Sequence, residues 1–197
     1  MTLFGEYFSW LEITGTVFGI AGVWLTVKRN IYCFPTGLVN VILYAWLFYQ
    51  SKLYADALLQ LFYVVLLLYG WYEWMYGKKV HTEGVSVTSF RLRVVLILSA
   101  GLFTFIAGSW FSKNTDAAFP FIDALTTAMS LVAQWMVARK KIENWLVWIA
   151  ADLIYIGMYI SKHLYLTSIL YFIFIILAIA GFMEWKKELR RHAIATN

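Results

Sequence analysis

Charged residues are scarce in this sequence. Only 14% of its 197 residues are Asp, Glu, Lys or Arg, whereas 62% are hydrophobic. Soluble domains average about 25% charged and about 45–50% apolar residues. The shortage of charge therefore excludes an ordinary soluble domain and predicts an integral membrane protein whose main surroundings are the lipid bilayer.

Cysteine, histidine and the common catalytic motifs are also rare. The single cysteine, Cys33, excludes an intrachain disulfide and a thiolate metal cluster. His81, His163 and His192 fall in predicted loops or in the C-terminal tail, and no HExxH, P-loop or GxSxG motif occurs. Because no nucleophile–base pair or metal set converges, we expect neither an enzyme nor a bound cofactor.

Long apolar runs are what the sequence does contain. A transmembrane helix needs about 17–25 mainly apolar residues. Seven runs qualify, at residues 8–28, 34–51, 54–76, 91–111, 118–138, 145–161 and 164–185. Residues 51–52 and 162–163 must form tight turns, and the polar segment 77–90 separates the first three helices from the rest.

Basic residues are distributed unevenly between the predicted loops. An N-terminus outside the cell leaves only Lys52, Lys113 and Lys162 on the outer side. The basic residues that then face the cytoplasm are Lys28, Arg29, Lys78, Lys79, Arg91, Arg93, Arg139, Lys140, Lys141, Lys186, Lys187, Arg190 and Arg191. The positive-inside rule thus predicts an N-out, C-in topology. This topology explains the net charge of +5 without any nucleic-acid partner.

The chain also repeats itself at a constant offset. Trp74 and Trp185 are 111 residues apart, as are Trp24 and Trp135. Further pairs at this offset are Glu12 with Asp123, Thr16 with Thr127, Tyr44 with Tyr155, Gly70 with Gly181, and Glu73 with Glu184. We therefore predict an all-α membrane protein with seven transmembrane helices in a 3+1+3 arrangement of parallel repeats. Its parts are a first three-helix bundle (1–76), a loop plus linker helix (77–117), a second three-helix bundle (118–185) and a basic cytoplasmic tail (186–197).

A stripe of aromatic residues around one acid marks the predicted sixth helix. Trp145, Trp148, Asp152 and Tyr155 follow at spacings of three or four, which places them on one helix face. A carboxylate at bilayer depth is costly and usually functional, and aromatic ring faces attract cations. The stripe indicates a site for a flat, cationic, aromatic solute. Alternatively, Asp152 hydrogen-bonds a neighbouring helix and the rings fill space.

Polar residues on the second and third helices extend this candidate site. Asn40 and Tyr44 lie one turn apart, and Gln60 occupies the next helix. A carboxamide can donate and accept hydrogen bonds to a sugar hydroxyl or an amide. For Asn40, an interhelical hydrogen bond is an equally good explanation. In parallel-repeat transporters the solute site lies near the membrane midplane, between the repeats.

Two long segments resemble one known family. They are CFPTGLVNVILYAWLFYQSKLYADALLQLFYVVLLLYGWYEW and NWLVWIAADLIYIGMYISKHLYLTSILYFIFIILAIAGFMEW, with paired LY hairpins, a GWxxW end and an NWxxWxxxD opening. They are similar to the nicotinamide riboside transporter (PnuC) family, which has thiamine-transporting members. The resemblance implies a fold like that of the SWEET sugar transporters, a multi-pass location in a bacterial inner membrane, and compatibility with a homotrimer. It also implies facilitated diffusion of a vitamin that cytosolic phosphorylation traps.

We therefore expect uptake of nicotinamide riboside, a precursor of NAD, by alternating access. A thiamine transporter of the same family is the alternative, and a membrane receptor that transports nothing is a third reading. Both vitamins are aromatic cations, whereas riboflavin is neutral and larger and would leave Asp152 unexplained. The expected substrate-binding residues are Asn40, Tyr44, Gln60, Trp145, Trp148, Asp152 and Tyr155.

Overall fold

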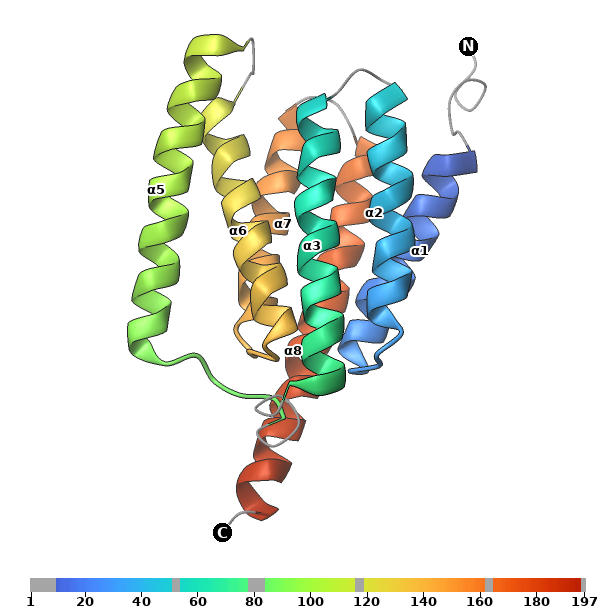
Figure 1. The fold of residues 1–197 in the computed structure, drawn as a ribbon, viewed down its shortest axis with the longest axis vertical. Helices are drawn as coiled ribbons and strands as arrows, with labels where there is room; N and C mark the ends of the chain where they lie inside the picture. The colour runs from blue at the N-terminus through green and yellow to red at the C-terminus, as the bar shows by residue number, and fades with distance from the viewer. Residues whose placement is uncertain (1–9, 51–53, 78–83, 116–118, 162–164, 196–197) are drawn as a thin grey trace.

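The computed structural model describes residues 10–50, 54–77, 84–115, 119–161 and 165–195, and these form an all-helical bundle. The predicted turns at 51–52 and 162–163 lie outside this part of the chain. The described residues form seven helices. They are α1 (Trp10–Val27), α2 (Cys33–Gln50), α3 (Tyr54–Tyr76), α5 (Phe90–Asn114), α6 (Pro120–Ala138), α7 (Asn144–Ser161) and α8 (Tyr165–Ala195). They lie side by side, and α8 projects beyond the others (Figure 1).

The predicted helices agree with these bounds to within three residues, except at the end of α8. The sequence predicts an end at 185, but the helix continues to Ala195. The segment after Trp185 lacks Gly and Pro and is rich in Lys, Glu, Leu and Arg, which favour helix. Ion pairs one turn apart, such as Lys187 with Glu184 at 3.9 Å, add to this preference. The basic tail is therefore a helical extension.

Helix α5 shows most clearly that the protein lies in lipid. Its most hydrophobic part has a mean hydropathy of 2.0, yet only 6% of that part is buried. Ile97, Leu98 and Phe105 are exposed, and a continuous apolar surface of this kind is incompatible with water. The helices long and apolar enough to cross a membrane are Phe90–Asn114, Pro120–Ala138, Asn144–Ser161 and Ser168–Arg191. Shorter apolar stretches cover Ile13–Val27 and Cys33–Leu47.

The helices other than α5 close into a ring. Within each half, helices that follow one another in sequence pack together, α1 on α2 and α2 on α3, then α6 on α7 and α7 on α8. Two further contacts, α1 with α8 and α3 with α6, join the halves. Helix α5 packs on α6 outside the ring, at the left edge of Figure 1. The ring therefore encloses a central space with two seams.

The turns after α1 and α6 have the same geometry. Arg29 and Lys140 adopt left-handed backbone conformations, with φ of 54° and 47°. Their N–H groups donate to the carbonyls of Thr26 and Val137 at 3.0 Å, and the next N–H groups complete a Schellman motif at each helix end. These two turns lie 111 residues apart in sequence. Both turns lie at the lower end of Figure 1, which we call the basic end, defined by Lys28, Arg29, Arg139, Lys140 and Lys141.

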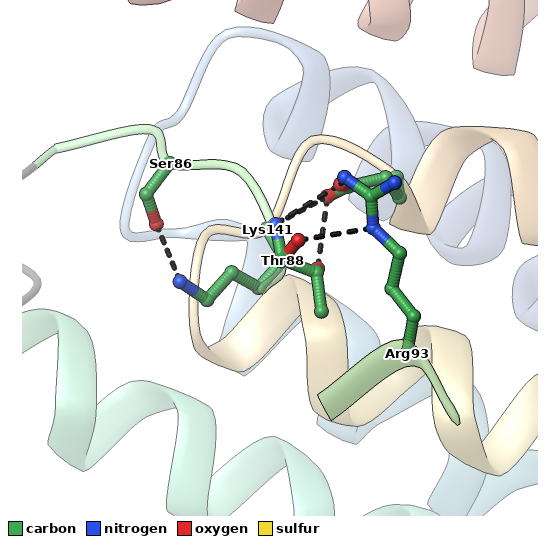
Figure 2. Close-up of polar contacts among 5 residues, drawn as sticks. Ser86, Thr88, Arg93 and Lys141 are labelled. Carbon is green, nitrogen blue, oxygen red and sulfur yellow. Dashed lines mark hydrogen bonds and ion pairs between the residues drawn. The ribbon is translucent and has the colours of Figure 1, made fainter. Parts of the chain in front are cut away.

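The segment before α5 is clasped to the turn between α6 and α7 (Figure 2). Ser86 forms a parallel bridge with Lys141, whose Nζ donates to the Ser86 hydroxyl at 2.8 Å. The Glu143 carboxylate accepts hydrogen bonds from the Thr88 N–H at 3.0 Å and hydroxyl at 2.9 Å, and from Arg93 at 2.9 Å. These contacts, which we call the clasp, fasten the start of α5 to the turn between α6 and α7. The rest of α5 packs on α6, so both attachments are to the same half of the ring.

Candidate functional site

A cavity of about 450 Å³ lies inside the ring. Its volume is within the range of about 300–1,000 Å³ that is usual for small-molecule sites. All seven residues predicted from sequence line it, namely Asn40, Tyr44, Gln60, Trp145, Trp148, Asp152 and Tyr155. The lining side chains come from the six ring helices, and α5 contributes none. The structure thus brings together the two stripes that the sequence placed on separate helices.

Asp152 is the one charged side chain lining this cavity among the described residues. It is only 4% exposed. Its carboxyl group makes no ion pair or hydrogen bond with another described residue, so the interhelical hydrogen bond considered above is not found there. Burying a carboxylate without compensation costs several kcal/mol. The cavity therefore presents an acidic group that no described side chain neutralises.

Aromatic rings from α7 and α8 form the wall around this acid. Tyr155 and Tyr159 are stacked at 6.0 Å with an angle of 19° between the rings, and Tyr171 lies 4.8 Å from Tyr155. Trp148 is half-buried and also lines the cavity. Ring faces attract cations and stack on flat solutes. This wall is suited to a planar, positively charged molecule.

Trp145 differs from Trp148 in its surroundings. It is 2% exposed and meets Trp185 edge-on, with ring centroids 5.4 Å apart. It also lies flat over Gly181, where an added Cβ would be 2.5 Å from its ring. Its buried Nε1 has no hydrogen-bond partner in the described part of the chain. Trp145 is therefore packed between its neighbours and offers the cavity no open ring face.

Asn40 and Tyr44 are held by α1. The Asn40 Nδ2 donates to the Gly15 carbonyl at 2.7 Å, and the Tyr44 hydroxyl bonds to the Thr16 hydroxyl at 3.1 Å. The structural alternative for Asn40 is thus present, because this bond joins two helices. Its Oδ1 remains as a further acceptor at the cavity. Gln60, on α3, is half-buried and lines the same space.

Sequence reasoning missed several residues of the α8 wall. Tyr171 and Phe174 line the cavity, although they lie within a long apolar run. The 111-residue offset was the signal that would have identified them. It relates Tyr171 to Gln60 and Phe174 to Tyr63, and all four line the cavity.

Two buried indoles close the cavity at the basic end. Trp74 donates from Nε1 to the Val137 carbonyl, and Trp185 donates to the Thr26 carbonyl, both at 3.2 Å. The acceptor residues line the cavity, whereas Trp74 and Trp185 are 5% and 0% exposed. We call this pair of indoles the floor. Its two hydrogen bonds occupy positions related by the 111-residue offset.

Membrane helices ringed around an internal cavity with polar groups define a transporter of small solutes rather than a membrane anchor. The chain belongs to the nicotinamide mononucleotide transporter family, whose model matches residues 9–187. It is thus a multi-pass transporter of the inner membrane, as the resemblance predicted.

Similar proteins extend over nearly the whole chain. The nicotinamide riboside transporter PnuC of Escherichia coli strain K12 is 28% identical, covering 94% of this chain and 89% of that protein. PnuC of Neisseria mucosa is 27% identical over 94% of this chain and 75% of its own length. The riboflavin/roseoflavin transporter RibM of Streptomyces davaonensis is 24% identical over 96% and 90%. A crystal structure of the vitamin B3 transporter PnuC matches with a TM-score of 0.75 and 25% identity, covering 94% and 84%.

Proposed function

We propose that this chain carries nicotinamide riboside into the cell by facilitated diffusion, with cytosolic phosphorylation trapping the vitamin. The names of several relatives support this substrate. The observation that carries the proposal is Asp152, a buried carboxyl group in an aromatic cavity without a described counter-charge. The pyridinium ring of nicotinamide riboside is flat and cationic, and would supply that charge.

The cavity offers a partner for each part of this solute. Asp152 is the counter-charge, and the rings of Trp148 and Tyr155 stack on the pyridinium. A cation over a ring gains about 0.5–2 kcal/mol. Asn40 and Gln60 would meet the ribose hydroxyls or the carboxamide. The Tyr44 hydroxyl, bonded to α1, shapes the wall.

The proposed arrangement in the membrane is seven spans, N-out and C-in, with parallel repeats at 1–76 and 118–185 and α5 as linker. The matching Schellman turns and the matching indole hydrogen bonds support the repeat. The basic end would then be cytoplasmic.

Transport would proceed by rocking one three-helix bundle against the other. The halves meet at two seams, α1 with α8 and α3 with α6, so a rigid-body rotation leaves the packing within each bundle intact. Assembly as a homotrimer is a further proposal from the resemblance. It predicts a trimer mass by light scattering of the purified protein.

Asp152 also ranks the alternative substrates. Thiamine is an aromatic cation and would satisfy the carboxyl group as nicotinamide riboside does. Riboflavin, the solute in the name of the RibM relative, is neutral and would leave the buried acid uncompensated. Thiamine is therefore the second candidate.

Tryptophan fluorescence of the purified protein tests the choice. We expect saturable quenching by nicotinamide riboside, weaker quenching by thiamine and none by riboflavin, and a much reduced signal in Trp148→Phe. Quenching by thiamine alone would identify thiamine as the substrate in place of nicotinamide riboside. Quenching by riboflavin alone would contradict the role of Asp152. Flux into sealed liposomes separates a transporter from a receptor, which would bind without transport.

A further inference from the structure

We propose that the basic end is the cytoplasmic gate, and that a two-layer latch holds it shut in this structure. The inner layer is the floor, Trp74 and Trp185. The outer layer is two ion pairs, Arg29 with Glu188 and Arg139 with Glu73. This inference rests on the proposed topology and adds to it the residues that must separate before the solute reaches the cytoplasm.

The inner layer spans both seams of the ring. Trp74, on α3, bonds to a carbonyl of α6, and Trp185, on α8, bonds to a carbonyl of α1. The two rings are also in contact, with centroids 6.3 Å apart. Phe34 and Trp145, which line the cavity, press edge-on against Trp74 and Trp185. Solute cannot pass toward the basic end unless the indoles part.

The outer layer crosses the same seams. The Arg29 guanidinium, after α1, lies 2.8 Å from a Glu188 carboxylate oxygen on α8. The Arg139 guanidinium, after α6, lies 3.0 Å from Glu73 on α3. The Lys140 ammonium, from the turn after α6, lies 4.7 Å above the ring of Trp74. Each contact links one half of the ring to the other.

These bonds are strong enough to hold the gate and weak enough to release it. Partly exposed ion pairs are individually weak, because solvent screens them. A hydrogen bond also contributes little net stability, because water can replace its partner once the seam opens. The closed state is then only modestly favoured over the open one, so thermal motion and solute binding can open the gate.

Cys33 provides a built-in reporter of the gate. It is the single cysteine of the sequence, is 4% exposed and lines the cavity at the start of α2. A membrane-impermeant, negatively charged thiol reagent added from the cytoplasmic side reaches Cys33 only after the latch opens. The native protein therefore needs no introduced probe, and Cys33→Ser serves as the labelling blank.

The experiment measures the rate of Cys33 modification in inverted membrane vesicles, whose cytoplasmic face is outside. We expect Glu73→Gln and Glu188→Gln each to raise the rate about fivefold, and the double variant to raise it further. Trp185→Phe, which removes the indole donor, should also raise it. The matched control is Glu184→Gln. Glu184 is the repeat counterpart of Glu73 but pairs within α8, with Lys187, so its rate should stay at the wild-type value.

Three outcomes would overturn the latch. One is labelling of Glu73→Gln and Glu188→Gln at the wild-type rate. Another is an equal increase in Glu184→Gln. The third is a faster rate of Cys33 modification in variants that have also lost cooperative thermal unfolding in the same preparations. Nicotinamide riboside flux is measured separately, so a protein with a working latch but no flux would refute the proposed substrate while leaving the gate in place.

Discussion

The floor and the wall of the cavity use the internal repeat in opposite ways. In the floor, Trp74 and Trp185 make the same hydrogen bond at equivalent positions. In the wall, Asp152 is the equivalent of Val41. Matched residues thus build the closure that both halves share, whereas the site adds an unmatched charge, Asp152, to a wall that also contains the matched Tyr44 and Tyr155. An asymmetric solute on a pseudo-twofold axis requires this difference.

The largest expected effect on binding comes from removing the charge of Asp152, which has no counterpart in the other repeat. Asp152→Asn keeps the volume of the side chain and loses the charge, which costs about 2 kcal/mol or more for a buried charge pair. Binding of nicotinamide riboside should weaken by at least about 30-fold, measured by tryptophan fluorescence titration. Val41→Ala, at the equivalent position, should change binding by less than about threefold. Similar losses in both variants would contradict a charge-specific site.

Equivalent substitutions beside the two indoles of the floor should lower the stability of the protein equally. Gly70 and Gly181 let Phe34 and Trp145 pack closely, since an added Cβ would lie 2.4 and 2.5 Å from their rings. Gly70→Ala and Gly181→Ala should each destabilise the protein by about 1–3 kcal/mol through overpacking. The control is Gly101→Ala, where an added Cβ meets nothing within 4 Å. Thermal unfolding in detergent measures all three, and a much larger effect at one site than at the other would break the proposed equivalence.

The clasp of Figure 2 lies outside the repeat and should affect α5 alone. Glu143→Gln weakens charged hydrogen bonds to Thr88 and Arg93, and should cost about 2 kcal/mol. Hydrogen exchange should rise in the segment before α5. Thr88→Val removes one hydroxyl and keeps the backbone donor, so its effect should be smaller. An increase in exchange on α2 instead would show that the clasp supports the whole ring.

The smallest effect concerns Lys140 and pH. Burial and the nearby Arg29 charge lower the pKa of Lys140. The unfolded chain then binds more protons between the lowered pKa and the ordinary value near 10.5, so unfolding free energy should rise with pH across that interval. Lys140→Met should lack this increase. Unfolding followed from neutral to alkaline pH provides the measurement, and equal slopes for both proteins would contradict it.

The sequence alone predicted the helices and the seven candidate site residues, but it did not predict Tyr171 or the clasp. Helix positions followed from apolar runs, and the seven candidate residues followed from polar and aromatic side chains at helical spacing. Tyr171 escaped because an aromatic residue in an apolar helix has no distinguishing spacing. The clasp escaped because Thr88 and Glu143 are 55 positions apart and follow no period. Only the fold brings such loops together.

Flux of nicotinamide riboside into sealed liposomes tests directly whether the protein carries this solute through the cavity. The purified protein should equilibrate labelled nicotinamide riboside across the membrane without an ion gradient, and Asp152→Asn should reduce the initial rate at low solute concentration by at least about tenfold. A kinase and ATP inside the liposomes should then convert equilibration into accumulation. Entry that Asp152→Asn leaves unchanged, or no entry despite binding, would contradict transport through this cavity.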